Sequence, residues 1–205
     1  GAFNDTQAQE MAGHAIAEAV KRSKVSKEEI DDVIIGAAGQ QGSQQGNIAR
    51  QSLLRAGLPV SVAGMSLDRQ CASGMMAIAT AAKEITEDGM TITVGGGVES
   101  VSLVRNENFR MDRARDPWLE ENIPSLYMTM IETAENVAKR YDISRESQDE
   151  YALQSQMRTA NAQKNGLMDK EIVPLKSTMK YKDKETGEIS SHDVCIEKDE
   201  GNRPS

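Results

Sequence analysis

The sequence has few of the residues that metal sites, disulfide scaffolds and nucleic-acid surfaces require. Its 205 residues include only two cysteines, Cys71 and Cys195, which lie far apart in the chain, and two histidines, His14 and His192, which are too few and too scattered for a ligand cluster. Such spacing predicts neither a disulfide framework nor a zinc site. The net charge of −8 argues against a nucleic-acid partner and against binding to an anionic membrane. These scarcities predict an acidic protein of a reducing, cytoplasm-like compartment that holds no metal.

Long apolar runs and aromatic side chains are also scarce. No apolar run reaches the roughly 18 residues of a transmembrane helix, and residues 1–5 lack a basic and apolar signal-peptide pattern. Aromatic residues make up 3% of the chain, whereas methionine occurs 11 times. The core is therefore expected to consist of aliphatic side chains and methionine, and the length allows one large domain or two small ones.

The first hundred residues contain an alternation of amphipathic helices and short apolar strands. The expected elements, in chain order, are a helix over 6–22, a strand over 32–38, a helix over 47–55, a strand over 62–67, a helix from 72 and a strand over 90–94. Asp5 is the expected N-cap of the first helix. This order predicts an α/β fold with a mainly parallel sheet that is covered on both faces. Residues 39–46, rich in Gln and Gly, are expected to form a flexible loop outside the core.

The most unusual stretch is the helix that follows the strand over 62–67. From Ala72 to Ala82 every residue is apolar, small or both, and a helix that is apolar on all sides is normally buried. Cys71 stands at the turn that leads into it. A helix N-terminus stabilises a thiolate, and an oxyanion on an attacked carbonyl, through its unpaired N–H groups and its dipole. The position suggests a nucleophilic cysteine for acyl transfer, although a buried structural cysteine is the commoner role of a free thiol.

Three consecutive glycines, Gly95, Gly96 and Gly97, follow the expected strand over 90–94. They lack the G-x-G-x-x-G spacing and the following helix of a dinucleotide site. Close backbone packing near the cysteine is the simpler interpretation.

The second half of the sequence is more polar than the first. It predicts a helix over 123–141, a long helix from the cap Ser144 to Asn165, and a hairpin turn at Thr186-Gly187. Four arginines alternate with acidic residues here: Arg105, Arg110, Arg113 and Arg115. A solvated loop is the default interpretation of this cluster, and contact with a coenzyme A phosphate is the alternative. Cys195 lies in polar surroundings and is expected to take no part in chemistry.

Motifs that follow one another along the chain carry a resemblance to the thiolase family. They are Leu67-x3-Cys71-Ala-Ser73-Gly74-Met-x-Ala77-Ile78, Gly95-Gly96-Gly97-Val98-Glu99-Ser100-Val101-Ser102, the helical segments 133–138 and 144–149, and the segments 171–174 and 199–205. The first resembles the family's acyl-enzyme cysteine signature and the second its glycine-rich segment. The others resemble its loop domain, so the resemblance covers nearly the whole chain.

The resemblance implies a fold, a division into domains and a reaction. The fold is the N-terminal half of a thiolase, an α/β core with a buried nucleophile helix, followed by a largely helical loop domain. Residues 1–101 would be the core without the family's first strand, and residues 102–205 an incomplete loop domain that covers coenzyme A. The reaction is acyl transfer between 3-ketoacyl-CoA and CoA, by thiolysis or the reverse condensation, through an acyl-cysteine. Coenzyme A is then a substrate, no resident cofactor is expected, and the full-length enzyme would be a homodimer or homotetramer.

Three site residues follow from the resemblance. Cys71 is the nucleophile, and its backbone N–H contributes to an oxyanion hole. Met130 falls where the family has an acyl-pocket methionine, and Arg203 falls near the coenzyme nucleotide. Two positions depart from the family: Asp68 stands where the signature usually carries Asn, and Thr129 stands where many biosynthetic members have His. The second departure favours a degradative enzyme of fatty-acid β-oxidation.

The resemblance also implies a second half, which supplies an Asn, a His in a Gly-His-Pro motif and a Cys in a Cys-x-Gly-Gly-Gly motif. None of these motifs occurs in this sequence, so the isolated chain is expected to be inactive. Two alternatives stay open. The chain could be a non-catalytic fragment that binds CoA or acyl groups, or part of a ketosynthase-type condensing enzyme with a similarly placed cysteine.

Overall fold

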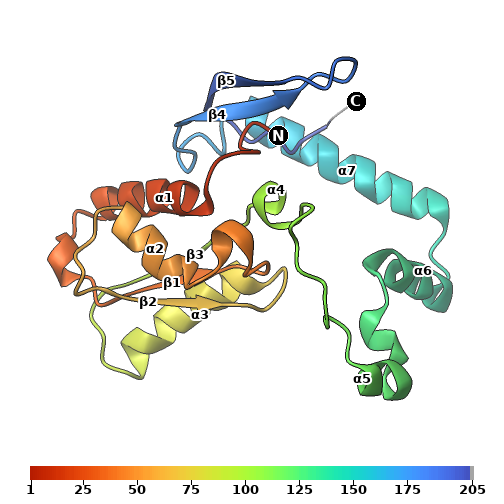
Figure 1. Ribbon diagram of the computed structural model, residues 1–205, viewed down its shortest axis with the longest axis horizontal. Helices are drawn as coiled ribbons and strands as arrows, with labels where there is room; N and C mark the ends of the chain where they lie inside the picture. Colours follow the sequence, from red (N-terminus) through yellow and green to blue (C-terminus); the bar gives the residue numbers. More distant parts are fainter. Residues whose placement is uncertain (204–205) are drawn as a thin grey trace. The chain divides into compact units, whose positions relative to one another are not determined.

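The structure is a computed structural model that describes residues 1–203, and it packs as two compact units (Figure 1). The first unit comprises Gly1–Phe109 and Val173–Glu197, and the second comprises Arg110–Ile172 and the segment from Lys198 onward. The sequence predicts a single division, between residues 101 and 102. Residues 102–109 and the segment Val173–Glu197, which the sequence places in the loop domain, pack with the first unit.

A three-stranded parallel sheet forms the centre of the first unit. The strands are β1 (Asp32–Gly36), β2 (Ala63–Leu67) and β3 (Thr93–Gly97), in the order β2-β1-β3. Asp32 is in register with both Ala63 and Thr93. All five residues of β1 are buried, because this central strand is covered on both faces. The expected continuous apolar strand and parallel sheet are confirmed.

Alternate side chains of β1 point to opposite layers. Val33 and Ile35 pack in one core with α1 (Ala8–Ser23) and α2 (Ile48–Arg55), whereas Ile34 packs in another with Ala77 and Ala81 of α3 (Ser73–Thr86). Figure 1 shows α1 and α2 on one side of the sheet and α3 on the other. Successive side chains of a strand point to opposite faces of the sheet, which explains why neighbouring residues of β1 pack in different layers.

The cap of α1 differs from the one expected from the sequence. The helix begins at Ala8 with Gln7 as its N-cap, not with Asp5. The Asp5 carboxylate instead lies 3.0 Å from the Lys180 ammonium, so it is engaged in an ion pair rather than at the helix terminus.

Burial of the α3 helix on all sides is not observed in the described residues. Ser73, Ala77, Ala81 and Glu84 face the sheet and are buried, whereas Met75 is 75% exposed and Ile78 is 58% exposed. The expectation of a buried helix was therefore wrong for its outer face. A single layer of sheet covers one face of a helix and leaves the opposite one open.

Glycines let α3 lie unusually close to the sheet. A Cβ at Gly36 would lie 2.2 Å from the Ser73 carbonyl carbon, and one at Gly95 would lie 2.8 Å from the Ile78 Cα. The sequence placed Gly95 and Gly97 after a strand that ended at 94, whereas they lie inside β3. The expected close backbone packing is nevertheless found, because Gly97 meets the backbone of Gly74.

An antiparallel hairpin completes the first unit. It consists of β4 (Leu175–Lys182) and β5 (Ile189–Ile196), joined by a turn that contains Thr186 and Gly187, as predicted. The Asn4 side chain donates to the Lys180 carbonyl (2.6 Å) and accepts from the Lys180 N–H (3.0 Å). These two bonds attach the hairpin to the N-terminal segment.

The second unit is helical. Its elements are α5 (Pro117–Asn122), the short 3₁₀ segment η3 (Pro124–Tyr127), α6 (Met130–Tyr141) and α7 (Arg145–Lys164). The single helix expected over 123–141 is broken, because Thr129 caps a new helix and exchanges hydrogen bonds with Glu132. Ser144 caps α7, as predicted. Within residues 1–203, no helix has the length and apolarity that a bilayer crossing requires.

The remaining short elements join these parts. They are the 3₁₀ turns η1 (Lys27–Glu29) and η2 (Gly42–Gln44) and the one-turn helix α4 (Val101–Val104).

Two acidic side chains are buried at the far end of α3 from Cys71. Burial, followed by the like charges of Asp32 and Asp88, raises the pKa of Glu84, and one Glu84 oxygen has no hydrogen-bond partner. Burial also raises the pKa of Asp32. Because the folded state holds these protons more tightly than the unfolded chain, the free energy of unfolding should fall as the pH rises above the ordinary carboxyl value of 4.5.

We therefore expect Glu84→Gln to stabilise the protein at pH 7 by on the order of 1 kcal/mol and to flatten the loss of stability between pH 5 and pH 7. Urea unfolding at both pH values measures this effect. Glu87→Gln, at an exposed position beside the same helix end, is the matched control and should leave the pH dependence unchanged. A parallel pH dependence in wild type and Glu84→Gln would contradict the assignment.

Candidate active site

Cys71 lies on the turn between the end of β2 and the start of α3. Its thiol is free and exposed. The preceding residue, Gln70, has a φ of 48°, a left-handed conformation that few residues other than glycine adopt. Such backbone conformations persist only where surrounding contacts fix them, and they are common at functional sites.

Hydrogen bonds from two side chains fix this turn. The Asp68 carboxylate accepts from the Gln70 N–H (2.7 Å). The Ser73 hydroxyl accepts from the Arg69 N–H (2.9 Å) and donates to the Gln70 carbonyl (2.6 Å). Aspartate at position 68 therefore keeps a hydrogen-bonding role in the turn. Because the turn is fixed by these neighbours, the Cys71 side chain is left free for chemistry.

The turn opens onto a cavity of about 500 Å³. Its wall combines the Cys71 turn, the carboxyl ends of β1 and β3, and the segments that follow these strands: Gly36, Ala38, Gly39, Gln70, Cys71, Ser73, Gly74, Gly97, Val98, Glu99, Val101 and Arg105. The carboxyl ends of parallel strands are where α/β proteins place their ligands. The geometry thus brings a free thiol, a helix N-terminus and a cavity together.

A buried amide joins two walls of this cavity. Gln44, only 1% exposed, donates to the Glu99 carboxylate (2.7 Å) and to the Gly39 carbonyl (2.8 Å), and its side-chain oxygen accepts from the Ser100 N–H. Glu99 accepts in turn from the backbone N–H groups of Ala38 (2.8 Å) and Gly39 (3.2 Å). The expectation that residues 39–46 lie outside the core was wrong at Gln44, because a partner 55 residues away satisfies its amide.

Replacing Gln44 by methionine should cost about 2–4 kcal/mol of unfolding free energy. The new side chain has a similar length, but Glu99 and the Ser100 N–H each lose a partner, and hydrogen bonds to charged groups are among the stronger ones. Chemical denaturation measures the change. Gln45→Met, at an exposed neighbour, should cost less than about 0.5 kcal/mol, and equal costs at the two positions would refute the assigned role.

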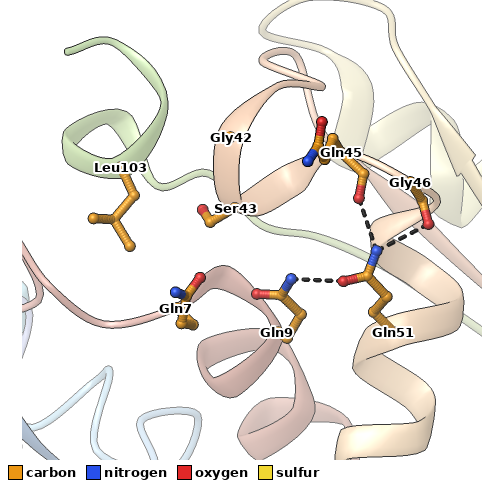
Figure 2. A pocket seen from close by; sticks show the side chains of 8 residues that line it. All are labelled: Gln7, Gln9, Gly42, Ser43, Gln45, Gly46, Gln51 and Leu103. Carbon is orange, nitrogen blue, oxygen red and sulfur yellow. Dashed lines mark hydrogen bonds between the residues drawn. The ribbon is translucent and has the colours of Figure 1, made fainter. Parts of the chain in front are cut away.

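A second cavity, of about 560 Å³, is larger but chemically poorer (Figure 2). The Gln9 amide donates to the Gln51 side-chain oxygen (2.6 Å), and the Gln51 amide donates to the Gln45 and Gly46 carbonyls. Figure 2 shows this chain of amides along one wall. All the lining side chains are neutral, and none is a thiol or an imidazole. The smaller Cys71 cavity is therefore the candidate site for chemistry.

The other expected site residues lie in the second unit. Met130 is the first residue of α6 and is 75% exposed. Arg203 is exposed, and its backbone N–H donates to the Gln156 side chain (2.8 Å). Their roles toward an acyl group and a coenzyme stay predictions.

The remaining cysteine and the histidines do not join the Cys71 cavity. Cys195 is exposed on β5, and its thiol lies 3.8 Å from the Glu197 carboxylate. His14 belongs to α1 and His192 to β5. Residues 1–203 contain no group of three or more His, Cys, Asp or Glu side chains placed to hold a metal ion.

Comparison with known proteins matches this architecture to one family. The family model described as "Thiolase, N-terminal domain" matches residues 1–205. The chain belongs to the thiolase family. The 3-oxoadipyl-CoA/3-oxo-5,6-dehydrosuberyl-CoA thiolase of Escherichia coli K12 is 37% identical over 195 residues, covering 85% of this chain and 47% of that protein. The peroxisomal 3-ketoacyl-CoA thiolase of Yarrowia lipolytica is 34% identical over 207 residues, covering all of this chain and 48% of that protein.

A solved thiolase-family structure supports the fold. The acetyl-CoA acetyltransferase of Bacillus anthracis superposes with a TM-score of 0.76 at 33% identity, covering 99% of this chain and 51% of that one. The predicted α/β thiolase N-terminal half is therefore confirmed. The thiolase chain described here spans about half the length of the relatives that it matches.

Proposed function

We propose that this chain supplies the nucleophile of an acyl-CoA C-acyltransferase, which transfers an acyl group between 3-ketoacyl-CoA and CoA through a thioester on Cys71. The observation that carries the proposal is the free, exposed Cys71 thiol on a fixed turn before α3, in the wall of a cavity. A thiolate is the strongest nucleophile among ordinary side chains near neutral pH.

The proposed chemistry balances in two steps. The Cys71 thiolate attacks the 3-keto carbon, the bond between C2 and C3 breaks, and the released two-carbon unit takes a proton and leaves as acetyl-CoA. The CoA thiol then attacks the Cys71 thioester, gives up its proton and regenerates the cysteine. The backbone N–H groups of Ala38 and Gly39 are bound to Glu99, so the oxyanion is expected at the first turn of α3 instead.

The described residues that line the cavity include no histidine, and we propose that the base that activates Cys71 belongs to another part of the enzyme. We therefore propose that the isolated chain holds and positions the nucleophile but turns over negligibly. This keeps the non-catalytic, acyl- or CoA-binding fragment as the second candidate for the isolated chain. The ketosynthase-type alternative loses its support, since the related proteins are thiolases and an acetyltransferase.

The substrate class follows from what the relatives are named for. One is named for 3-oxoadipyl-CoA and another for 3-ketoacyl-CoA, and both names denote coenzyme A esters with a keto group at C3. We propose that class here, with coenzyme A as substrate rather than resident cofactor. A cytoplasmic location, an assembly of two or four copies and a role in fatty-acid β-oxidation belong to the same proposal.

Intact mass after incubation with acetyl-CoA, followed by peptide mapping, tests the proposed function. The full-length enzyme should carry one acetyl group on Cys71 and none on Cys195. Labelling of the full-length enzyme but not of the isolated chain would place activation of the thiol outside these residues. Labelling of another residue in the full-length enzyme would refute the proposal.

A further inference from the structure

One cationic side chain lines the Cys71 cavity, and the acyl-transfer chemistry makes no use of it. Arg105 follows α4 directly, and its backbone N–H donates to the Val101 carbonyl (2.8 Å). The α4 helix itself is held firmly. Val104 is 3% exposed, and its side chain would lie 2.8 Å from a Cβ at Gly39. The backbone that carries Arg105 is therefore fixed against the cavity wall.

The charge of Arg105 is not compensated within the part of the chain that the structure describes. Its guanidinium carbon lies 5.6 Å from the centre of the Phe109 ring, and it forms no ion pair within residues 1–203. Two arginines of the same sequence cluster are paired, Arg110 with Asp112 and Arg115 with Glu120. The ion pairing expected of a solvated, mixed-charge loop is thus found for those two and not for Arg105, whose side chain is exposed.

The one carboxylate in the cavity wall has its own partners. Both oxygens of Glu99 accept from backbone N–H groups, and one of them also accepts from the Gln44 amide. Such donors compensate a carboxylate charge. The uncompensated charge that an entering group meets is consequently the positive one on Arg105.

We propose that Arg105 makes the Cys71 cavity selective for acyl chains that end in a carboxylate. This rests on the proposed function, because the group attached to the Cys71 sulfur during acyl transfer is the acyl chain. A planar guanidinium binds a carboxylate through two parallel N–H···O bonds. The phosphates of coenzyme A offer the same anionic oxygens, but the whole pantetheine arm separates them from the reacting sulfur. A carboxylate at the end of the acyl chain therefore lies nearer to the Cys71 sulfur than the coenzyme phosphates do.

Alkylation of Cys71 measures this selectivity without requiring turnover. In the full-length protein, the rates of modification by iodoacetate and by iodoacetamide are followed at Cys71 and Cys195 by peptide mapping. The ratio of the two rates reports the local charge. We expect Arg105→Gln to lower the iodoacetate-to-iodoacetamide ratio at Cys71 about fivefold, Arg105→Lys to retain most of it, and the ratio at Cys195 to stay constant. An unchanged Cys71 ratio in Arg105→Gln overturns the proposal.

Protection by added anions distinguishes the two sources. Adipate, a dicarboxylate without a nucleotide, should slow iodoacetamide modification of Cys71 in the wild type and not in Arg105→Gln. Arg105-dependent protection by adenosine 3′,5′-bisphosphate with none by adipate would assign the charge to the coenzyme and overturn the proposal. Alkylation of Cys71 does not require an acyl-enzyme. Failure of Cys71 to accept an acetyl group would therefore refute the proposed function, whereas the alkylation rates would still test the role of Arg105.

Discussion

Replacing Cys71 by serine in the full-length enzyme should abolish the acetyl adduct and lower turnover roughly 10⁴-fold or more. The hydroxyl has nearly the same shape as the thiol, and the turn is held by Asp68 and Ser73 rather than by residue 71. The substitution should therefore leave the fold and its unfolding free energy almost unchanged. The loss would then measure nucleophilicity alone.

Cys195→Ser is the matched control for this experiment. Both cysteines are free and exposed, but Cys195 lies on a hairpin strand beside Glu197 and not at a helix N-terminus. Turnover and labelling of the Cys195→Ser enzyme should match those of the wild type. Full activity in Cys71→Ser, or a loss of equal size in both variants, would exclude Cys71 as the nucleophile.

Gly36→Ala should be the most destabilising single-methyl change in the sheet, with an expected cost of about 3–5 kcal/mol. The new Cβ would lie 2.2 Å from the carbonyl carbon and oxygen of Ser73 and 2.6 Å from the Gly74 nitrogen. Because these are backbone atoms at the start of α3, no side-chain rotation relieves the clash. The helix must shift, and Cys71 shifts with it.

Gly96→Ala gives the comparison for that change. Gly96 lies in β3, which is paired with β1, and the nearest atom to its added Cβ is the Ile35 Cδ1 at 3.9 Å, an ordinary van der Waals contact. We expect a change within about 0.5 kcal/mol. Thermal or urea unfolding of the two variants, together with the alkylation rate of Cys71, separates the two positions. Equal stabilities would mean that α3 does not approach the sheet as closely as described.

Structural features that depend on residues close together in the chain were predicted correctly from the sequence. The run of apolar residues in β1 identifies a strand buried on both faces, and Ser144 identifies the first turn of α7, because both signals lie within a few residues. The position of Cys71 before α3 follows from the same kind of local pattern. These features need no knowledge of distant contacts.

The features that were missed depend on residues far apart in the chain. Glycine is uncommon in strands, so β3 was expected to end at Val94, although the α3 backbone requires glycine at 95 and 97. Burial of Gln44 was not predicted, because the groups that satisfy its amide, Glu99 and the Ser100 N–H, lie far from it in the sequence. The outer face of α3 was expected to be buried, because an apolar helix is normally covered on all sides. Composition does not show whether the covering layers belong to the same part of the chain.

The close contact between α3 and the sheet also limits how this family member can diverge. In an ordinary core, a larger side chain at one position can be accommodated by a smaller one at its neighbour. At Gly36 and Gly97 the opposing atoms are main chain, and at Gly95 the nearest ones are, with the Ala81 Cβ also close; no substitution can make a main chain smaller. A mutation there has no compensating second-site partner, so these three positions should stay fixed while the aliphatic residues around them exchange freely.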